Sequence, residues 1–347
     1  MKVDYIIVGL GLAGLAFVEE LIEAKKTVIV YEDESQNSSL VAGGVFNPVV
    51  LKRFTPVWNG HQQLEKALPF YKKLEQKFNK QFIEFFSIKK ALKSIEDQNN
   101  WFEATDKPML DMYMKPTISN QKIEGVIADF GFGELTGTGR VLTEKLITTY
   151  RNYLIENDTI VFENFDYSKV LFQDQCVEYK NILAEKIVFC EGFGIVKNPF
   201  FNYLPLKEAK GELITIHSPE LDINFLLKST LFVLPLGNDY FKVGATFNWK
   251  DKTSKPSEEG KQELIEKLKK VLTVPYTITN QTAGIRPTVK DRRPLVGVHQ
   301  KYKNLIVLNG LGTRGVMIAP TVASNLFHHL EKEAVLDTEI DIKRFDT

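Results

Sequence analysis

The chain has 347 residues, with 44 Lys and Arg against 44 Asp and Glu, so its formal net charge is zero. Hydrophobic residues make up 44% and charged residues 25%, which is typical of globular proteins and excludes disordered, collagen-like and coiled-coil classes. The length suggests about two domains, at roughly 150 residues each, and the balanced charge argues against a broad polyanion-binding surface.

The N-terminal segment predicts a βαβ unit. Residues 3–8 and 27–31 have the unbroken apolar pattern of buried strands, and residues 12–24 lie between them as a helix. The apolar run 5–18 belongs to this unit, and it is shorter than the roughly 20 residues that span a bilayer. We therefore expect a cytoplasmic protein without membrane contact.

The following residues mix loops, helices and short strands. Residues 35–48 and the glycine-rich residues 129–139 predict loops, whereas 82–92 and 122–128 predict strands. The other expected elements are helices at 61–80, 141–155, 258–272 and 316–330 and strands at 159–165, 169–172, 176–179, 186–190, 211–217, 230–235, 240–246 and 304–308. Parallel-sheet signals occur at the start, middle and end, with alternating antiparallel segments between them, which favours two interleaved domains.

The chain has few cysteines and histidines, the residue types that most often bind metals or form disulfides. Cys176 and Cys190 belong to no CxxC motif, and the five histidines have no metal-ligand spacing. We expect no disulfide framework and no metal site, and the two thiols indicate a reducing compartment.

The turn after the first strand carries a dinucleotide motif, Gly9-Leu10-Gly11-Leu12-Ala13-Gly14. Gly9 permits a tight turn, Gly11 lets backbone N–H groups approach a pyrophosphate, and Gly14 allows close packing of helix and strand. Glu32 ends the second strand at the spacing expected of a ribose-hydroxyl ligand, which disfavours NADP. Motif and spacing alone leave FAD and NAD open.

Further motifs match one known family in order along most of the chain. They are the small-residue loop Ser38–Gly44, the strand Lys186–Gly192, Ala209–Glu212, Val243–Thr246, Ala283–Pro287 followed by Asp291 and Pro294–Gly297, and Asn309–Gly315. With the N-terminal fingerprint, the chain resembles the FAD-dependent amine and amino-acid oxidases, which include D-amino-acid oxidase, glycine oxidase and sarcosine oxidase. The last turn, and residues 45–48, are similar to the oxidase half of the bifunctional enzyme that forms 5-methylaminomethyl-uridine in tRNA.

The resemblance implies an α/β fold, α+β overall, in which two discontinuous domains interleave. A Rossmann-like FAD-binding domain would comprise residues 1–80, 140–205 and 281–347, and an antiparallel-sheet substrate domain residues 81–139 and 206–280. FAD is expected to be non-covalent, because the Cys or His used for covalent attachment is absent from the corresponding places. The implied FAD-binding residues are Gly9, Gly11, Gly14, Glu32, Ser38, Ser39, Ala42, Gly43, Gly44, Tyr167, Gly192, Gly310, Leu311, Gly312, Thr313, Arg314, Gly315, Val316 and Met317.

Two arginines are the candidate catalytic residues. Arg286 would hold a substrate carboxylate through two parallel N–H···O bonds, and its alternative is a structural ion pair with Asp291 or another acid. Arg314, at the start of the last helix, would stabilise negative charge on reduced flavin or anchor the substrate, and its alternative is a solvated arginine. Aromatic residues Phe232, Tyr240 and Phe247 are the candidate substrate pocket. Phe232 falls where glycine oxidase has a tyrosine that helps hold the carboxylate, which argues against glycine itself.

The resemblance implies an FAD-dependent oxidoreductase that oxidises the C–N bond of a small amino acid or N-substituted glycine to an imine by hydride transfer to flavin. The electron acceptor would be O2 or another oxidant. The alternative function is a tRNA-modification oxidase acting on a carboxymethylaminomethyl nucleoside, although the balanced charge does not favour tRNA as a partner. A flavin-binding protein without turnover and an NAD-dependent dehydrogenase are the remaining hypotheses.

Overall fold

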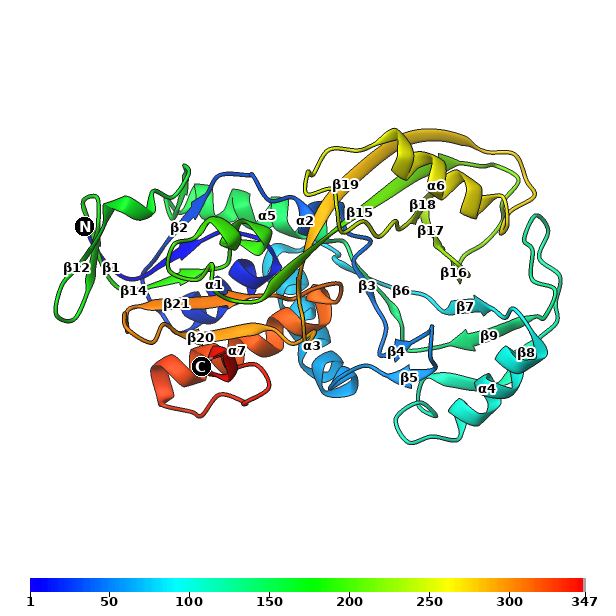
Figure 1. Ribbon diagram of the computed structural model, residues 1–347, viewed down its shortest axis with the longest axis horizontal. Helices are drawn as coiled ribbons and strands as arrows, with labels where there is room; N and C mark the ends of the chain where they lie inside the picture. Colours follow the sequence, from blue (N-terminus) through cyan, green and yellow to red (C-terminus); the bar gives the residue numbers. More distant parts are fainter. Residues whose placement is uncertain (346–347) are drawn as a thin grey trace.

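The computed structural model of the protein describes residues 1–345 and arranges them around two large sheets (Figure 1). The first sheet has the order β11-β2-β1-β14-β13-β12, with β21 paired to β14 and β20 paired to β21. Its strands are β1 (Lys2–Val8), β2 (Val28–Glu32), β11 (Ile160–Phe162), β12 (Val170–Phe172), β13 (Val177–Tyr179), β14 (Ile182–Phe189), β20 (Leu295–Val298) and β21 (Leu305–Asn309). The pairs among β11, β2, β1, β14 and β21 are parallel.

The parallel strands β1, β2 and β21 are largely buried on both faces, which explains their apolar sequences. On one face, helices α1 (Leu12–Glu23), α3 (Gly60–Phe78), α5 (Thr143–Glu156) and α7 (Gly315–Lys332) contribute to one apolar core. On the other face, an aromatic cluster fills the space, with Phe165 stacked on Tyr179 at a centroid distance of 4.1 Å.

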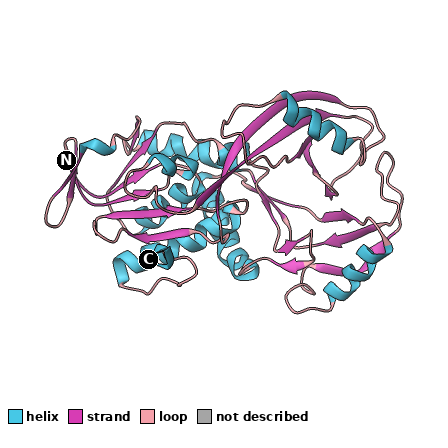
Figure 2. Ribbon diagram, viewed as in Figure 1, coloured by secondary structure: helices cyan, strands magenta, loops and turns pink. Residues whose placement is uncertain are grey.

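The second sheet has the order β19-β15-β18-β17-β16-β7-β9-β8 and is antiparallel except for the pair β16–β7. Its strands are β7 (Ile88–Ala91), β8 (Met114–Ser119), β9 (Phe132–Leu135), β15 (Leu206–His217), β16 (Leu226–Lys228), β17 (Phe232–Gly237), β18 (Tyr240–Gly244) and β19 (Thr277–Val289). Figure 2 shows that this region is mainly strands and loops, whereas most helices gather on the first sheet. Helix α6 (Glu258–Leu268) covers one face of the second sheet, and α4 (Ile95–Thr105) packs at its β8 end.

Short elements connect the two sheets. Strands β3 (Val45–Phe46), β6 (Ile83–Phe85) and β10 (Gly139–Val141) form a small sheet, and β4 (Val49–Val50) pairs with β5 (Thr55–Pro56). The remaining elements are α2 (Ser38–Val41) and the 3-10 helices η1 (Tyr167–Lys169), η2 (Gly192–Lys197) and η3 (Ile342–Phe345). None of the helices within residues 1–345 has the length and apolar character needed to cross a membrane.

Two of the sequence-based assignments were wrong. Residues 122–128 form no strand, because Ile123, Val126 and Ala128 instead anchor a loop against the core under α6, with a single bridge from Val126 to Leu272. Residues 129–139 are not one long loop, since they contain β9 and the first residue of β10. Gly133 weakens the strand pattern of β9 in the sequence. Glycine is nevertheless required at this position, because a Cβ would lie 2.5 Å from the ring of Trp101.

Residues 35–48, expected to form a loop, include the short elements α2 and β3. Strand β19 stays paired with β15 as far as Val289, so residues 281–289 lie in the second sheet rather than among the parallel strands. The division into two interleaved domains with the boundaries given above stays a prediction.

Candidate active site

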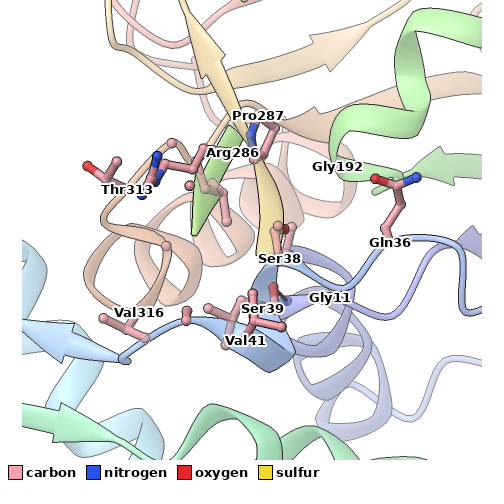
Figure 3. Close-up of a pocket in the computed structure, with 18 of the residues that line it drawn as sticks. Gly11, Gln36, Ser38, Ser39, Val41, Gly192, Arg286, Pro287, Thr313 and Val316 are labelled. Atoms are coloured by element: carbon pink, nitrogen blue, oxygen red, sulfur yellow. Dashed lines mark hydrogen bonds between the residues drawn. The ribbon is translucent and has the colours of Figure 1, made fainter. Parts of the chain in front are cut away.

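A cavity of about 810 Å³ lies between the two sheets. One end is formed by the carboxyl ends of β1, β2 and β14, where open α/β sheets bind ligands, and the other end by the inner face of the second sheet. In Figure 3, Arg286 and Thr313 lie on one side of the cavity, Gly192 and Gln36 lie on the other, and Ser38 and Ser39 lie beside Gly11.

The glycine turn after β1 has the shape of an anion site. Gly9 has a φ of +96°, and a Cβ there would lie 2.7 Å from the carbonyl oxygen of Cys190. A Cβ on Gly14 would lie 2.1 Å from the carbonyl oxygen of Gly9, so α1 packs against the turn only with glycine at this position. Gly11 begins the helix without a side-chain cap, and residues 9–13 line the cavity. The positive end of the α1 dipole therefore faces the cavity, as a pyrophosphate site requires.

Glu32 lies beside this turn at the end of β2 and is buried. One carboxylate oxygen accepts the N–H of Leu10 at 2.5 Å, and the other accepts the N–H of Glu34 at 2.7 Å. Burial raises the pKa of Glu32, although these two donors oppose the rise. Each oxygen keeps acceptor capacity toward the cavity, which fits a pair of ribose hydroxyls.

The small-residue loop 38–44 is held between the two sheets. The Oγ of Ser39 accepts the N–H of Leu12 at 3.3 Å, and the side-chain amide of Asn37 donates to the carbonyl of Ala283 at 3.1 Å. Gly44 has a φ of +64°, and a Cβ there would lie 1.9 Å from the carbonyl oxygen of Val141. The loop thus forms a cavity wall that side chains would otherwise obstruct.

The second glycine turn brings α7 to the cavity. Gly310 and Gly312 both have positive φ, and the N–H of Gly312 donates to the carbonyl of Pro287 at 3.1 Å. Arg314 is the N-cap residue of α7, and its guanidinium forms no hydrogen bond or ion pair with any described residue. Burial lowers the pKa of Arg314, and the positive charge of Arg292 lowers it further. The structure therefore does not place Arg314 as a fully solvated residue.

Arg286 projects from β19 across the surface of Gly211, where a Cβ would lie 2.0 Å from a guanidinium nitrogen. The guanidinium lies over the Phe247 ring, 4.9 Å from its centroid, and donates to the carbonyl of Thr246 at 3.3 and 3.4 Å. Within residues 1–345 it has no carboxylate partner, and the alternative of an ion pair with Asp291 is wrong because Asp291 binds Arg344 at 2.8 Å. Burial lowers the pKa of Arg286 to about 10. Its guanidinium has donors free for a bound carboxylate.

The other predicted residues divide into two groups. Those that line the cavity are Gly9, Gly11, Glu32, Ser38, Ser39, Ala42, Gly43, Gly44, Tyr167, Gly192, Leu311, Gly312, Thr313, Arg314, Gly315, Val316, Phe232, Phe247 and Arg286. Gly14, Gly310 and Met317 lie behind this wall, where they shape the turns and the core. Tyr240 was wrongly predicted to line the pocket: it is 39% exposed at the far end of β18, with its ring 4.7 Å from that of His217.

Six charged residues in the cavity wall were missed: Asp33, Lys52, Glu163, Glu191, Lys197 and Lys228. Glu191 follows β14, accepts the hydroxyl of Tyr167 and the side-chain amide of Asn198, and has its pKa raised to about 7 by burial. Lys228 ends β16 and points its charge toward the second-sheet end of the cavity. Lys228 directly ends a short apolar strand, which was the signal available for it, whereas Glu191 follows β14 only after Cys190.

Curated relatives match parts of the chain at low identity. Glycine oxidase from Bacillus subtilis (strain 168) is 25% identical over 138 residues, which are 38% of this chain and 37% of that protein. D-amino acid dehydrogenase from Helicobacter pylori (strain J99) is 23% identical over 307 residues, 82% of this chain and 69% of that protein. The tRNA 5-methylaminomethyl-2-thiouridine biosynthesis bifunctional protein MnmC from Campylobacter jejuni subsp. doylei is 21% identical over 155 residues, 42% of this chain and 25% of that protein.

The fold is shared with solved structures along nearly the whole chain. Glycine oxidase from Bacillus cereus has a TM-score of 0.79 at 15% identity, with 96% of each chain covered. L-alpha-glycerophosphate oxidase from Mycoplasma pneumoniae, solved with FAD bound, has a TM-score of 0.77 at 19% identity, with 95% of each chain covered.

The family comparison agrees with the geometry of the cavity. The sequence profile of the FAD dependent oxidoreductase (DAO) family matches residues 4–327. FAD fits the residues present, because the turn of residues 9–13 and the uncapped N-terminal end of α1 line the cavity, and a buried carboxylate, Glu32, lines the same end. With a match along most of its length, this chain belongs to the DAO family and is an FAD-dependent oxidoreductase.

Proposed function

We propose that the enzyme oxidises the C–N bond of a small amino acid or an N-substituted glycine to an imine. One observation supports this most: the buried guanidinium of Arg286 faces the cavity with no carboxylate partner among the described residues. A buried guanidinium without a counter-ion is unfavourable, so the site favours a ligand that carries a carboxylate.

The chain's own residues then bind and orient this substrate. Two parallel N–H···O bonds from Arg286 fix both the position and the angle of the carboxylate. The Phe247 ring lies against the guanidinium, and Phe232 closes the cavity opposite Gly43, so water is excluded on two sides. Such orientation places the α-carbon for reaction, which is where most of the rate enhancement would arise.

Bound FAD supplies the electron-accepting group for this oxidation. The α1 turn would hold its pyrophosphate, Glu32 its ribose, and the loop 38–44 the adjoining part of the cofactor. Arg314 and the N-terminal end of α7 stabilise negative charge at the opposite side of the cavity. A substrate that binds with a neutral amine needs no side-chain base in this scheme.

The tRNA-modifying alternative has support from a partial relative only. The match to MnmC covers 25% of that bifunctional protein, and the net charge of this chain is zero. If it acted on a carboxymethylaminomethyl nucleoside, Arg286 would bind the carboxymethyl group in the same way. Binding to tRNA that weakens steeply with salt would favour this second function.

The remaining parts of the proposal concern acceptor and location. O2 or another oxidant would regenerate FAD, and the two unpaired cysteines agree with a reducing, cytoplasmic location. Peroxide release during turnover would identify O2 as the acceptor.

An anaerobic substrate screen tests the proposed function. We expect an N-substituted glycine or a small amino acid to bleach the visible flavin absorbance of the purified holoenzyme, and Arg286→Met to lose this response while it keeps bound FAD. A protein that dithionite bleaches but that no amine or amino acid bleaches would contradict the proposal.

A further inference from the structure

Lys228 is a second cation, besides Arg286, at the second-sheet end of the cavity. Lys228 ends β16, where it is paired with Phe232 on β17 and with Lys90 on β7. Leu226, two residues earlier on the same face of the strand, also lines the cavity, so both side chains point inward. In the described part of the chain, the side-chain ammonium of Lys228 forms no hydrogen bond or ion pair. Burial and the nearby Lys90, Lys93 and Lys267 lower the pKa of Lys228 to about 8.

Charge is divided unevenly between the two ends of the cavity. The acidic residues that line it, Glu32, Asp33, Glu163 and Glu191, lie around the dinucleotide end. Of the second-sheet strand residues that line it, only Lys228 and Arg286 are charged, and both are positive. This end of the cavity therefore favours a ligand with negative charge greater than that of one carboxylate.

The sheet register separates the two cations. Lys228 pairs with Phe232, Phe232 with Gly244, and Gly244 with Leu213, which makes three steps across the sheet. At about 4.8 Å per step this spans about 14 Å, and the Arg286 guanidinium lies over Gly211, two residues along β15 from Leu213. One carboxylate cannot contact both cations.

The surface between the two cations is apolar. Leu213 and Phe232 lie on it and pack over Gly244, where a Cβ would lie 2.7 Å from the Leu213 side chain, so the cavity wall here is formed by apolar side chains. An extended ligand with an anionic group at each end and an apolar linker fits this surface.

On the basis of the function proposed above, we propose that Lys228 binds a second anionic group of the substrate, at the end opposite the carboxylate held by Arg286. The substrate is then an amino acid or N-substituted glycine whose far end carries a carboxylate or phosphate. Binding stabilises the complex because the ammonium of Lys228 gains a charge-assisted hydrogen bond in place of partial solvation. The apolar linker lies over Phe232.

Equilibrium binding of unreactive acids to the holoenzyme tests this site without turnover. The probes are straight-chain dicarboxylates and monocarboxylates of equal length, followed by the change in the visible flavin spectrum. We expect a dicarboxylate of matching length to bind about tenfold or more tightly than its monocarboxylate to the wild type. Lys228→Met should abolish this preference by weakening the dicarboxylate alone, and Lys228→Arg should keep it.

A matched control removes the same charge from the other face of the sheet. Lys89 precedes Lys90 on β7, and its ammonium lies 4.3 Å from the centroid of the Phe225 ring. Lys89→Met should therefore leave the preference for dicarboxylates unchanged. Bound FAD and an unaltered melting temperature in Lys228→Met would show that it folds. Equal affinities for the two acids in the wild type, or an unchanged preference in Lys228→Met, would overturn the proposal.

Turnover separates this inference from the proposed function. The substrates to compare are N-(carboxypropyl)glycine, N-(phosphonopropyl)glycine and N-butylglycine. We expect the substrate whose far anion Lys228 prefers to have a lower KM than N-butylglycine. Oxidation of all three with equal kcat/KM would keep the proposed function and remove the role of Lys228. A dicarboxylate preference that depends on Lys228, without oxidation of any glycine, would keep the anion site and contradict the proposed function.

Discussion

The two ends of the cavity are built from different parts of the polypeptide. At the dinucleotide end the cavity wall is formed largely by the glycine-containing turns before α1 and α7. At the second-sheet end the wall is formed by side chains on β16, β17 and β19, which lie far apart in the sequence. The first arrangement suits a cofactor held through backbone geometry, and the second is the part that we propose recognises the substrate through charge and shape. Substitutions at the two ends should therefore fail in different ways.

The largest expected effect is at the dinucleotide end. In Gly14→Ala the added Cβ would lie 2.1 Å from the backbone oxygen of Gly9, so the helix and the turn must separate. We expect purified Gly14→Ala to lack bound FAD and to melt at a lower temperature, because overpacking against backbone costs about 1–3 kcal/mol or more. Gly194→Ala, whose Cβ would meet the side chains of Gln36 and Glu191 at ordinary contact distances of 3.5 and 3.6 Å, should retain the cofactor. Normal flavin content in Gly14→Ala would show that the turn tolerates separation.

This difference also explains which parts of the site could be predicted from sequence. The Gly9–Gly14 turn, its helix and its strand are contiguous, so their spacing alone predicts their geometry. Arg286 was found through its resemblance to a family motif, and its freedom from Asp291 depends on the packing of Arg344. Lys228 belongs to no motif, because its role depends on a register between strands that no local pattern specifies.

Secondary structure was missed for similar reasons. Strand β9 contains Gly133, which lowers the strand signal but is needed where the Trp101 ring packs. Tyr240 was placed in the pocket together with the neighbouring aromatic residues, yet it is the first residue of β18 and lies at the end of the strand that is remote from the cavity. In each instance a tertiary neighbour, rather than the local sequence, decides the position.

Arg286→Lys should weaken substrate binding at the second-sheet end of the cavity and leave FAD binding at the dinucleotide end unchanged. Lysine cannot form the two parallel bonds of a guanidinium, and the loss of one charge-assisted contact costs about 1.5–3 kcal/mol. We expect FAD to remain bound and kcat/KM for the best amine substrate to fall by roughly tenfold or more. The control Arg344→Lys alters an arginine whose partner is Asp291, outside the cavity, and should leave kcat/KM unchanged. Unaltered kinetics in Arg286→Lys would place the substrate carboxylate elsewhere.

Glu32→Gln should weaken the cofactor end moderately. The amide keeps one acceptor oxygen but replaces the other with a donor that faces the N–H of Leu10 or Glu34. We expect the affinity for FAD to fall by about tenfold, measured by reconstitution of the apoprotein, with the KM for substrate unchanged. Glu34→Gln, which removes the exposed partner of Arg151, is the matched control and should bind FAD normally. An unchanged FAD affinity in Glu32→Gln would exclude a ribose contact.

Glu191 provides a test by pH, in which the stability of the folded protein rather than catalysis is measured. Burial raises its pKa in the folded protein to about 7, above the value of 4.5 for a free glutamate, so the folded state holds this proton more tightly. The resulting stabilisation is present below about pH 4.5 and is lost as the pH rises through 7. Glu191→Gln resembles the protonated side chain and should remove this dependence. The free energy of unfolding of the wild type, relative to this variant, should therefore decrease by on the order of 2 kcal/mol between pH 5 and pH 7.5, measured by denaturation of the holoenzyme. A constant difference across that range would mean that Tyr167 and Asn198 hold Glu191 as a carboxylate throughout, and the dinucleotide end would then carry one more fixed negative charge against the cationic second-sheet end.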